Sequence, residues 1–218
     1  MKKFKLIIFD MDGVVIDSER FYDTKIINRF KELNIEIDVG ELNSVKGTNR
    51  KVDIDIFNKS NKSNDYVREQ LTKIVKESED ELRTFGAPLK QGVYEFIDKL
   101  KQNNFVICVA TSTRFELAKS MLEKVNIYDK FDFIVSSNDV KRAKPFPDIF
   151  IEACKKGKVN YDEALVIEDS NAGCLAAKEA GIAYVSLIDT ISFEEEIKES
   201  AILVTDSFTD IYTMIERI

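Results

Sequence analysis

The stretch Leu6-Ile7-Ile8-Phe9-Asp10-Met11-Asp12-Gly13-Val14 decides the fold. Its first part, Leu6–Phe9, predicts a short strand buried on both faces, because its apolar residues do not alternate with polar ones. Two carboxylates and a glycine follow, and open parallel sheets bind ligands at the carboxyl ends of their strands. Asp10 and Asp12 point the same way if strand geometry persists, and Gly13 allows a turn that brings backbone N–H groups near a ligand. Taken alone, the motif also fits an ordinary strand end with solvated aspartates.

Five further apolar runs follow at wide spacing and predict an α/β fold. Helical patterns lie between most of them from about residue 85 onward, and such alternation is typical of a parallel sheet with helices on both faces. We therefore expect a Rossmann-like core with a parallel sheet. The predicted later strands are Phe105–Ala110, Phe133–Ser136, Ala164–Ile167, Ala183–Leu187 and Ala201–Val204.

The part of the chain between the first strand and about residue 84 breaks this rhythm, because it holds no convincing strand. Apolar residues at helical spacing predict amphipathic helices there, the last of them with Ser63 or Asn64 as N-cap. A lone first strand is not stable without the later sheet, so we interpret the helical part as an insertion rather than a separate neighbouring domain. The expected division is a core of residues 1–16 and 85–218 and an all-helical cap domain of residues 17–84.

The composition excludes several classes of function. The 218 residues carry 32 Lys and Arg against 39 Asp and Glu, a net charge of −7, so no basic surface for nucleic acid or an anionic membrane is expected. There is no histidine, which removes His-dependent triads and His-bearing metal sites. Cys108, Cys154 and Cys174 lie in apolar or Ala-rich runs and are expected to be small buried hydrophobes. No apolar run suits a membrane span or a signal peptide, so we expect a cytoplasmic protein, with a monomer as the default.

Three polar segments fall at the ends of later strands or before a helix. Alone, Thr111-Ser112-Thr113-Arg114 is more often a helix N-cap, Lys144 a solvated loop lysine, and Glu168-Asp169 an acidic turn. Together with Asp10 and Asp12, these segments supply acids for a hard cation, hydroxyl and N–H groups for phosphate oxygens, and a lysine for developing charge. The combination predicts a phosphate site.

The chain resembles the haloacid dehalogenase-like phosphotransferase superfamily in four motifs, in this order: Asp10-Met11-Asp12-Gly13, Thr111, Lys144 and Glu168-Asp169. The resemblance runs from Phe4 to about Leu203. The inserted helical unit is similar to that of the subgroup with a four-helix cap. Within that subgroup, the runs Phe9–Glu19, Lys144–Phe150 and Glu168–Gly173 look like those of β-phosphoglucomutases and sugar-phosphate phosphatases.

The resemblance implies a role for each motif. Asp10 would attack phosphorus and form an aspartyl-phosphate, and Asp12 would protonate the leaving oxygen and then activate the acceptor. Mg²⁺ would be bound by Asp10, the backbone carbonyl of Asp12, and Asp169, with Glu168 nearby. Oxygen ligands suit Mg²⁺, and phosphoryl transfer depends mostly on positioning and charge neutralisation. The phosphoryl oxygens would be held by Thr111, Ser112 and Lys144.

The resemblance extends to residues that would contact the rest of the substrate. Lys46-Gly47-Thr48-Asn49-Arg50 matches a specificity loop of the mutases, in which Arg50 would contact a phosphate and Lys46 the sugar; a polar turn between helices is the alternative. Arg114 would serve a distal phosphate or only open a helix. The mutase pattern has a histidine in the first cap helix where this chain has Tyr22, which disfavours mutase activity and leaves Tyr22 as a pocket wall.

The leading hypothesis is Mg²⁺-dependent hydrolysis of a small phosphomonoester such as a sugar phosphate. Transfer of the β-phosphoglucomutase type is the alternative, because it uses the same core residues. Dehalogenation fits poorly, since it needs neither Asp12 nor a metal, and a phosphonatase would need a Schiff-base lysine in the cap, for which Lys46 and Lys51 are available. A catalytically silent binding protein is disfavoured by the presence of all four motifs.

Overall fold

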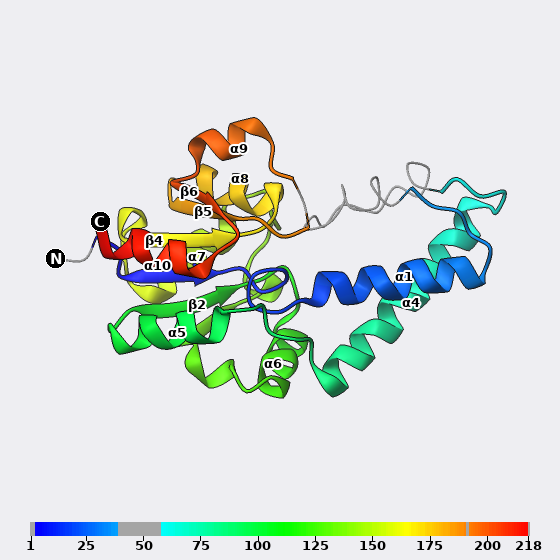
Figure 1. Cartoon of the computed structure of the whole chain (residues 1–218), viewed down its shortest axis with the longest axis horizontal. Helices are drawn as coiled ribbons and strands as arrows, with labels where there is room; N and C mark the ends of the chain where they lie inside the picture. Colours follow the sequence, from blue (N-terminus) through cyan, green and yellow to red (C-terminus); the bar gives the residue numbers. More distant parts are fainter. Residues whose placement is uncertain (1–2, 39–57, 191, 218) are drawn as a thin grey trace.

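A parallel sheet of six strands forms the centre of the computed structural model, which describes residues 3–38, 58–190 and 192–217 (Figure 1). The strands are β1 (Leu6–Phe9), β2 (Val106–Ala110), β3 (Phe133–Val135), β4 (Ala164–Glu168), β5 (Ala183–Leu187) and β6 (Leu203–Thr205). Their order across the sheet is β3-β2-β1-β4-β5-β6, and every neighbouring pair is parallel. Strand β1 is central, with Ile8 opposite Cys108 on one side and Val166 on the other.

Helices cover both faces of this sheet. They are α5 (Val93–Gln102), α6 (Phe115–Lys124), α7 (Asp148–Gly157), α8 (Asn171–Glu179), α9 (Glu195–Ser200) and α10 (Phe208–Arg217), with single-turn 3₁₀ helices at Tyr128–Lys130, Ser137–Asp139 and Tyr161–Glu163. Helices α5, α6 and α10 pack on the face that carries Ile7 and Phe9. Helices α7, α8 and α9 pack on the face that carries Leu6 and Ile8. Both faces of β1 are therefore buried, which explains its continuous apolar sequence.

Two long helices, α1 (Ser18–Glu32) and α4 (Asn64–Phe85), lie between β1 and β2 and extend away from the sheet as a helical insert (Figure 1). They pack against each other through an apolar cluster of their own: Ile26, Phe30, Ile35, Val67, Leu71 and Ile74. Helix α4 also packs on α6 of the core, where Ser120 Oγ donates a hydrogen bond to the carbonyl of Arg83 (3.0 Å). The insert thus has a small core separate from the sheet.

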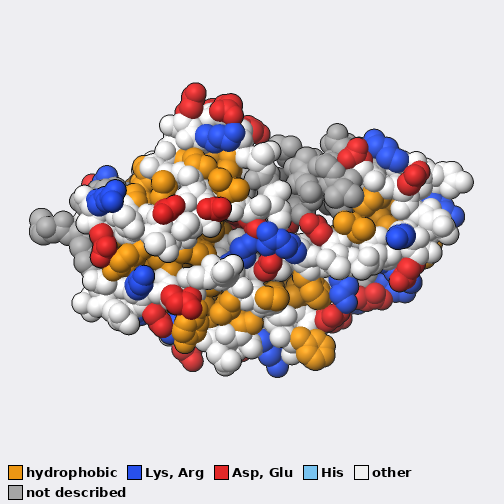
Figure 2. Space-filling view, viewed as in Figure 1, with side chains coloured by type: hydrophobic (Ala, Val, Ile, Leu, Met, Phe, Trp, Pro, Cys, Tyr) orange, Lys and Arg blue, Asp and Glu red, His pale blue; other side chains and the backbone are white. Residues whose placement is uncertain are grey.

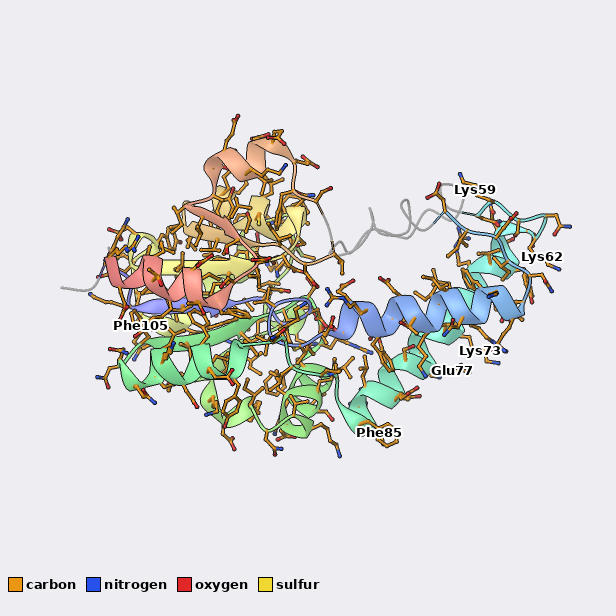
Figure 3. All side chains as sticks on the ribbon, in the orientation of Figure 1. Lys59, Lys62, Lys73, Glu77, Phe85 and Phe105 are labelled. Atoms are coloured by element: carbon orange, nitrogen blue, oxygen red, sulfur yellow. The ribbon has the colours of Figure 1, made fainter. Side chains whose placement is uncertain are left out.

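The ends of α4 follow ordinary capping chemistry. Ser63 is the N-cap, and its Oγ accepts a hydrogen bond from the N–H of Tyr66 (3.3 Å). The helix runs to Phe85, one residue beyond the predicted end of the insert, and stops at Gly86, whose φ of 75° favours glycine. Figure 3 shows Phe85 at this end, pointing away from the core, and the residue is 75% exposed.

The predicted α/β sheet with a helical insert is confirmed, and the boundaries differ by a few residues. The last strand begins at Leu203 rather than Ala201, because the N–H of Ala201 still donates to the carbonyl of Ile197 and completes α9. The three cysteines are buried and free, as expected: Cys108, Cys154 and Cys174. Within the described ranges, no helix combines the length and the apolar character needed to cross a membrane.

Candidate active site

Side chains at the carboxyl ends of three neighbouring strands converge at one edge of the sheet. Asp10 follows β1, Thr111 follows β2, and Glu168 and Asp169 stand at the end of β4. Backbone hydrogen bonds continue the sheet at this edge, since the N–H of Asp10 donates to the carbonyl of Ile167 (3.0 Å). The strand order reverses direction between β1 and β4, and such switch points are where open α/β sheets bind ligands. All four residues are buried, between 0 and 7% exposed.

Lys144 reaches this edge from the loop before α7 and bridges two carboxylates. Its Nζ donates to Asp10 Oδ1 and to Glu168 Oε1, both at 2.5 Å, and to the carbonyl of Ala110 at 3.3 Å. Burial lowers the pKa of Lys144, but its ion pairs with Asp10 and Glu168 outweigh burial and raise the pKa above its ordinary value. Lys144 therefore stays charged, and it is not the solvated loop lysine that its sequence context alone would favour.

The second carboxylate oxygen of Glu168, Oε2, is held by hydrogen bonds from the turn that follows β4. Glu168 Oε2 accepts hydrogen bonds from the N–H groups of Asp169 and Ser170, each at 3.0 Å, and from Ser170 Oγ at 2.9 Å. Gly173 in the first turn of α8 leaves room for this carboxylate, because a Cβ at that position would lie 1.8 Å from Glu168 Oε1. The orientation of Glu168 is thus fixed by the turn that leads into α8.

The carboxylate of Asp169 accepts no hydrogen bond from the residues that the structure describes, although the residue is only 4% exposed. Burial raises its pKa well above the usual range, and the neighbouring Glu168 and Asp10 raise it further. One oxygen from each of Asp10, Glu168 and Asp169 lies within 4.8 Å of the others. Among the described residues, the ammonium group of Lys144 is the one cation that pairs with any of these three buried carboxylates, and an all-oxygen donor set suits a hard cation. This group can therefore hold a divalent metal such as Mg²⁺.

Asp10 has one oriented and one open oxygen. Oδ1 is held by Lys144, whereas Oδ2 accepts no hydrogen bond within the described part of the chain. Burial raises the pKa of Asp10 well above its usual range; the ion pair with Lys144 opposes this, and the charges of Glu168 and Asp12 add to it. The side chain is thus fixed in direction with one oxygen left to react.

Asp12 lies outside the acidic group and is held by hydroxyls. Ser18 Oγ donates to Asp12 Oδ1, while Thr113 Oγ1 (3.0 Å) and Thr111 Oγ1 (3.4 Å) donate to Oδ2. Ser18 and Thr113 were not among the predicted site residues. Both stand inside the motif segments, but their contact with Asp12 depends on how α1 and the turn after β2 fold back over the sheet edge. The carbonyl of Asp12, expected to bind the metal, stays a prediction.

Gly13 allows Asp169 to approach the turn after β1, which gives a testable prediction. Gly13 has a φ of 84°, and a Cβ there would lie 1.9 Å from Asp169 Oδ2. Gly181 is a matched control, with a φ of 70° and nothing within 4 Å of its Cβ position. Each Gly→Ala change should cost about 1–2 kcal/mol of unfolding free energy for the backbone strain. We expect only Gly13→Ala to displace Asp169 as well and to lose divalent-metal affinity, measured by calorimetry. Equal metal affinity in both variants would contradict this role.

The remaining predicted residues lie around this site or outside the described ranges. Tyr22 on α1 is half-buried, and burial together with the charges of Asp12, Glu79 and Glu19 raises its pKa. Arg114 is exposed, precedes α6 and pairs with Glu79 of α4 at 3.5 Å, so it links the insert to the core. Ser112 lies beside Thr111 and is partly exposed. Lys46 and Arg50 lie outside the described residues.

Comparisons with known proteins find matches to this chain in both sequence and structure. The sequence profile of the haloacid dehalogenase-like hydrolases matches residues 7–187. A phosphorylated carbohydrates phosphatase from Thermotoga maritima is 31% identical, with 81% of each chain covered. A validoxylamine A 7'-phosphate phosphatase from Streptomyces hygroscopicus subsp. limoneus is 29% identical over 93% of this chain and 94% of the relative. The crystal structure of a β-phosphoglucomutase from Clostridium difficile superposes with a TM-score of 0.72 at 26% identity, covering 98% of this chain and 96% of the other.

Proposed function

We propose that this chain, which belongs to the haloacid dehalogenase-like hydrolases and is a phosphoric monoester hydrolase of that family, removes phosphate from a small phosphorylated sugar. The observation that carries this proposal is the burial and hydrogen bonding of Asp10. It is buried, oriented through one oxygen by Lys144, and open at the other, with a second carboxylate two residues later in the chain. A carboxylate nucleophile followed by a second carboxylate for proton transfer is what phosphoryl transfer through a covalent intermediate needs.

In the proposed first step, Asp10 Oδ2 attacks phosphorus, and the bond from phosphorus to the leaving oxygen breaks. Asp12 gives its proton to that oxygen, so the alcohol leaves neutral and Asp10 carries the phosphoryl group. In the second step Asp12 accepts a proton from water as the water oxygen attacks phosphorus, and Asp10 is released together with inorganic phosphate. The first step leaves Asp12 deprotonated, as the second step requires, and the second step returns a proton to Asp12 for the next turnover.

Asp10, Asp169 and, directly or through water, Glu168 would hold Mg²⁺, and their buried acidic group supports this assignment. A bound Mg²⁺ would neutralise part of the charge on the phosphoryl oxygens. Lys144 would place its positive charge beside the same oxygens. The hydroxyl of Thr111 and the partly exposed Ser112 lie at the end of β2, where they would complete the phosphate site.

The helical insert would determine the substrate specificity. We propose that residues 17–84 act as a cap domain over a core of residues 1–16 and 85–218. Tyr22 and Arg114 support this, because both lie where α1 and α4 meet the core. Tyr22 is close enough to Asp12 for the charge of that residue to raise the pKa of the tyrosine, and Arg114 pairs with Glu79 of α4. Lys46 and Arg50 remain candidates for contacts with the sugar. The absence of histidine from the sequence favours water over a second sugar hydroxyl as acceptor.

A screen of phosphorylated metabolites with product analysis tests this function. We expect inorganic phosphate to be released from sugar phosphates in the presence of Mg²⁺ and release to stop after EDTA treatment, returning when Mg²⁺ is added. Asp169→Asn should weaken Mg²⁺ binding, whereas Asp162→Asn, in the 3₁₀ turn before β4, should not. Full turnover after thorough metal removal would contradict the metal assignment.

With β-glucose 1-phosphate and a bisphosphate primer, glucose 6-phosphate forming faster than inorganic phosphate would favour the mutase.

A further inference from the structure

Four charged residues meet where the helical insert joins the core. Asp17 precedes α1, and Arg20 lies in its first turn. Lys90 lies in the segment that connects α4 to α5 of the core, and Asp189 follows β5. Figure 2 shows Lys and Arg side chains beside Asp and Glu side chains at this junction. None of the four belongs to the acidic group around Asp10.

A single oxygen of Asp189 accepts hydrogen bonds from both cations of this cluster. Arg20 Nη2 and Lys90 Nζ each donate to Asp189 Oδ1 at 2.6 Å, and Arg20 Nη1 donates to Asp17 Oδ2 at 2.9 Å. The side chain of Asp189 is 3% exposed, whereas that of Arg20 is 52% exposed. A buried carboxylate is costly without a partner, so Asp189 needs at least one of its cations.

The two cations stand on opposite sides of the connection between insert and core. The two connecting segments pair with each other: the N–H of Asp17 donates to the carbonyl of Pro88 (2.8 Å), and the N–H of Lys90 to that of Val15 (3.0 Å). Lys90 is therefore fixed beside Asp189 on the core side, while Arg20 is carried by α1. If α1 turns relative to the sheet, Lys90 can keep Asp189 paired while Arg20 leaves.

The first turn of α1 also carries Ser18, whose hydroxyl donates to Asp12. In the orientation seen here, Ser18 Oγ on α1 holds Asp12 Oδ1, while Thr113 Oγ1 and Thr111 Oγ1 of the core hold Oδ2, so the contact with Ser18 is the one that a movement of the insert would break. We propose that Arg20 and Asp189 form an ion-pair latch, which positions the first turn of α1 and holds the insert in the orientation that keeps Asp12 engaged by Ser18. Its effect on turnover rests on the proposed function, whereas the latch itself does not.

Removing the latch should free Asp12 Oδ1 from Ser18 more often. We expect Arg20→Gln to raise kcat by about two- to fivefold with little change in KM, because an ion pair with an exposed partner shifts such an equilibrium only modestly. The kcat of Arg20→Lys should fall between that of Arg20→Gln and that of the unaltered protein, since lysine keeps the charge but cannot contact Asp17 and Asp189 together as arginine does. Arg29→Gln is the matched control, because Arg29 lies on the same helix and pairs with Glu32 of that helix. A variant that only loosens the fold would lower kcat instead.

A distance measurement tests the latch independently of any activity. Glu69→Cys on α4 and Glu199→Cys on α9 place spin labels on exposed positions of insert and core, while the native cysteines are buried. We expect one main label–label distance in the otherwise unaltered and Arg29→Gln proteins, and a second population in Arg20→Gln and in Asp189→Asn. Distances in Arg20→Gln that match those of the Arg29→Gln control would overturn the latch, as would a kcat unchanged or lowered. If no variant turns over any phosphate ester, the proposed function fails, and the distances still decide the latch.

Discussion

Asp10→Asn should reduce phosphate release by about 10⁴-fold or more, the loss typical of removing a residue that takes part in bond making. The amide keeps the shape of the side chain but has no carboxylate oxygen to attack phosphorus. Lys144 remains paired with Glu168 in this variant, so its ammonium group is not left without a partner in the interior. We therefore expect the fold to survive, with a cooperative unfolding transition close to that of the unaltered protein.

Asp98→Asn serves as the control for this variant. Asp98 on α5 is also an ion-paired aspartate, with Lys130 as its partner, but its side chain is 39% exposed and lies outside the acidic group. Its substitution should leave phosphate release within about twofold, because an exposed ion pair contributes little to stability. If Asp10→Asn retained a rate close to that of Asp98→Asn, while both proteins were folded, Asp10 would not be the nucleophile.

Asp12→Asn should show the second large effect, and its size should depend on the leaving group. A general acid contributes about 10²–10⁴-fold, and a leaving group that is stable as an anion needs it least. In a single turnover, release of an alkyl alcohol should therefore fall by about that factor, while release of a nitrophenolate should fall much less. The single turnover matters because the second step needs Asp12 with every substrate. Equal losses for both substrates would mean that Asp12 does not protonate the leaving oxygen.

The residues that meet at the proposed active site were predictable from the sequence because strand ends are predictable. The apolar run before Asp10 and the one before Glu168 define parallel strands, and the carboxyl ends of parallel strands meet at one edge of the sheet. Each motif taken alone fits an ordinary loop or cap. Only their order along the chain, at the ends of predicted strands, indicated a common site.

Contacts that depend on the path of loops and helices were not predictable. Lys144 was a candidate by its motif, but nothing local shows that it bridges two buried carboxylates rather than facing solvent. The contact of Ser18 with Asp12 requires the first turn of α1 to fold back over the sheet edge. The pairing of Arg20 with Asp189 joins positions far apart in the sequence, and either residue alone reads as an exposed charge. The tertiary path of the chain decides these contacts, and periodicity carries no signal for them.

Chemical trapping of the covalent intermediate tests the central claim most directly. The protein would be mixed with Mg²⁺ and the best sugar phosphate from the screen, quenched within one turnover, and reduced with borohydride, which converts an aspartyl-phosphate to homoserine. Peptide mass spectrometry should then find homoserine at position 10 in the unaltered protein, and none in Asp10→Asn. Modification of a different carboxylate, or a full yield of phosphate during the first turnover with position 10 unmodified at every quench time, would contradict the account.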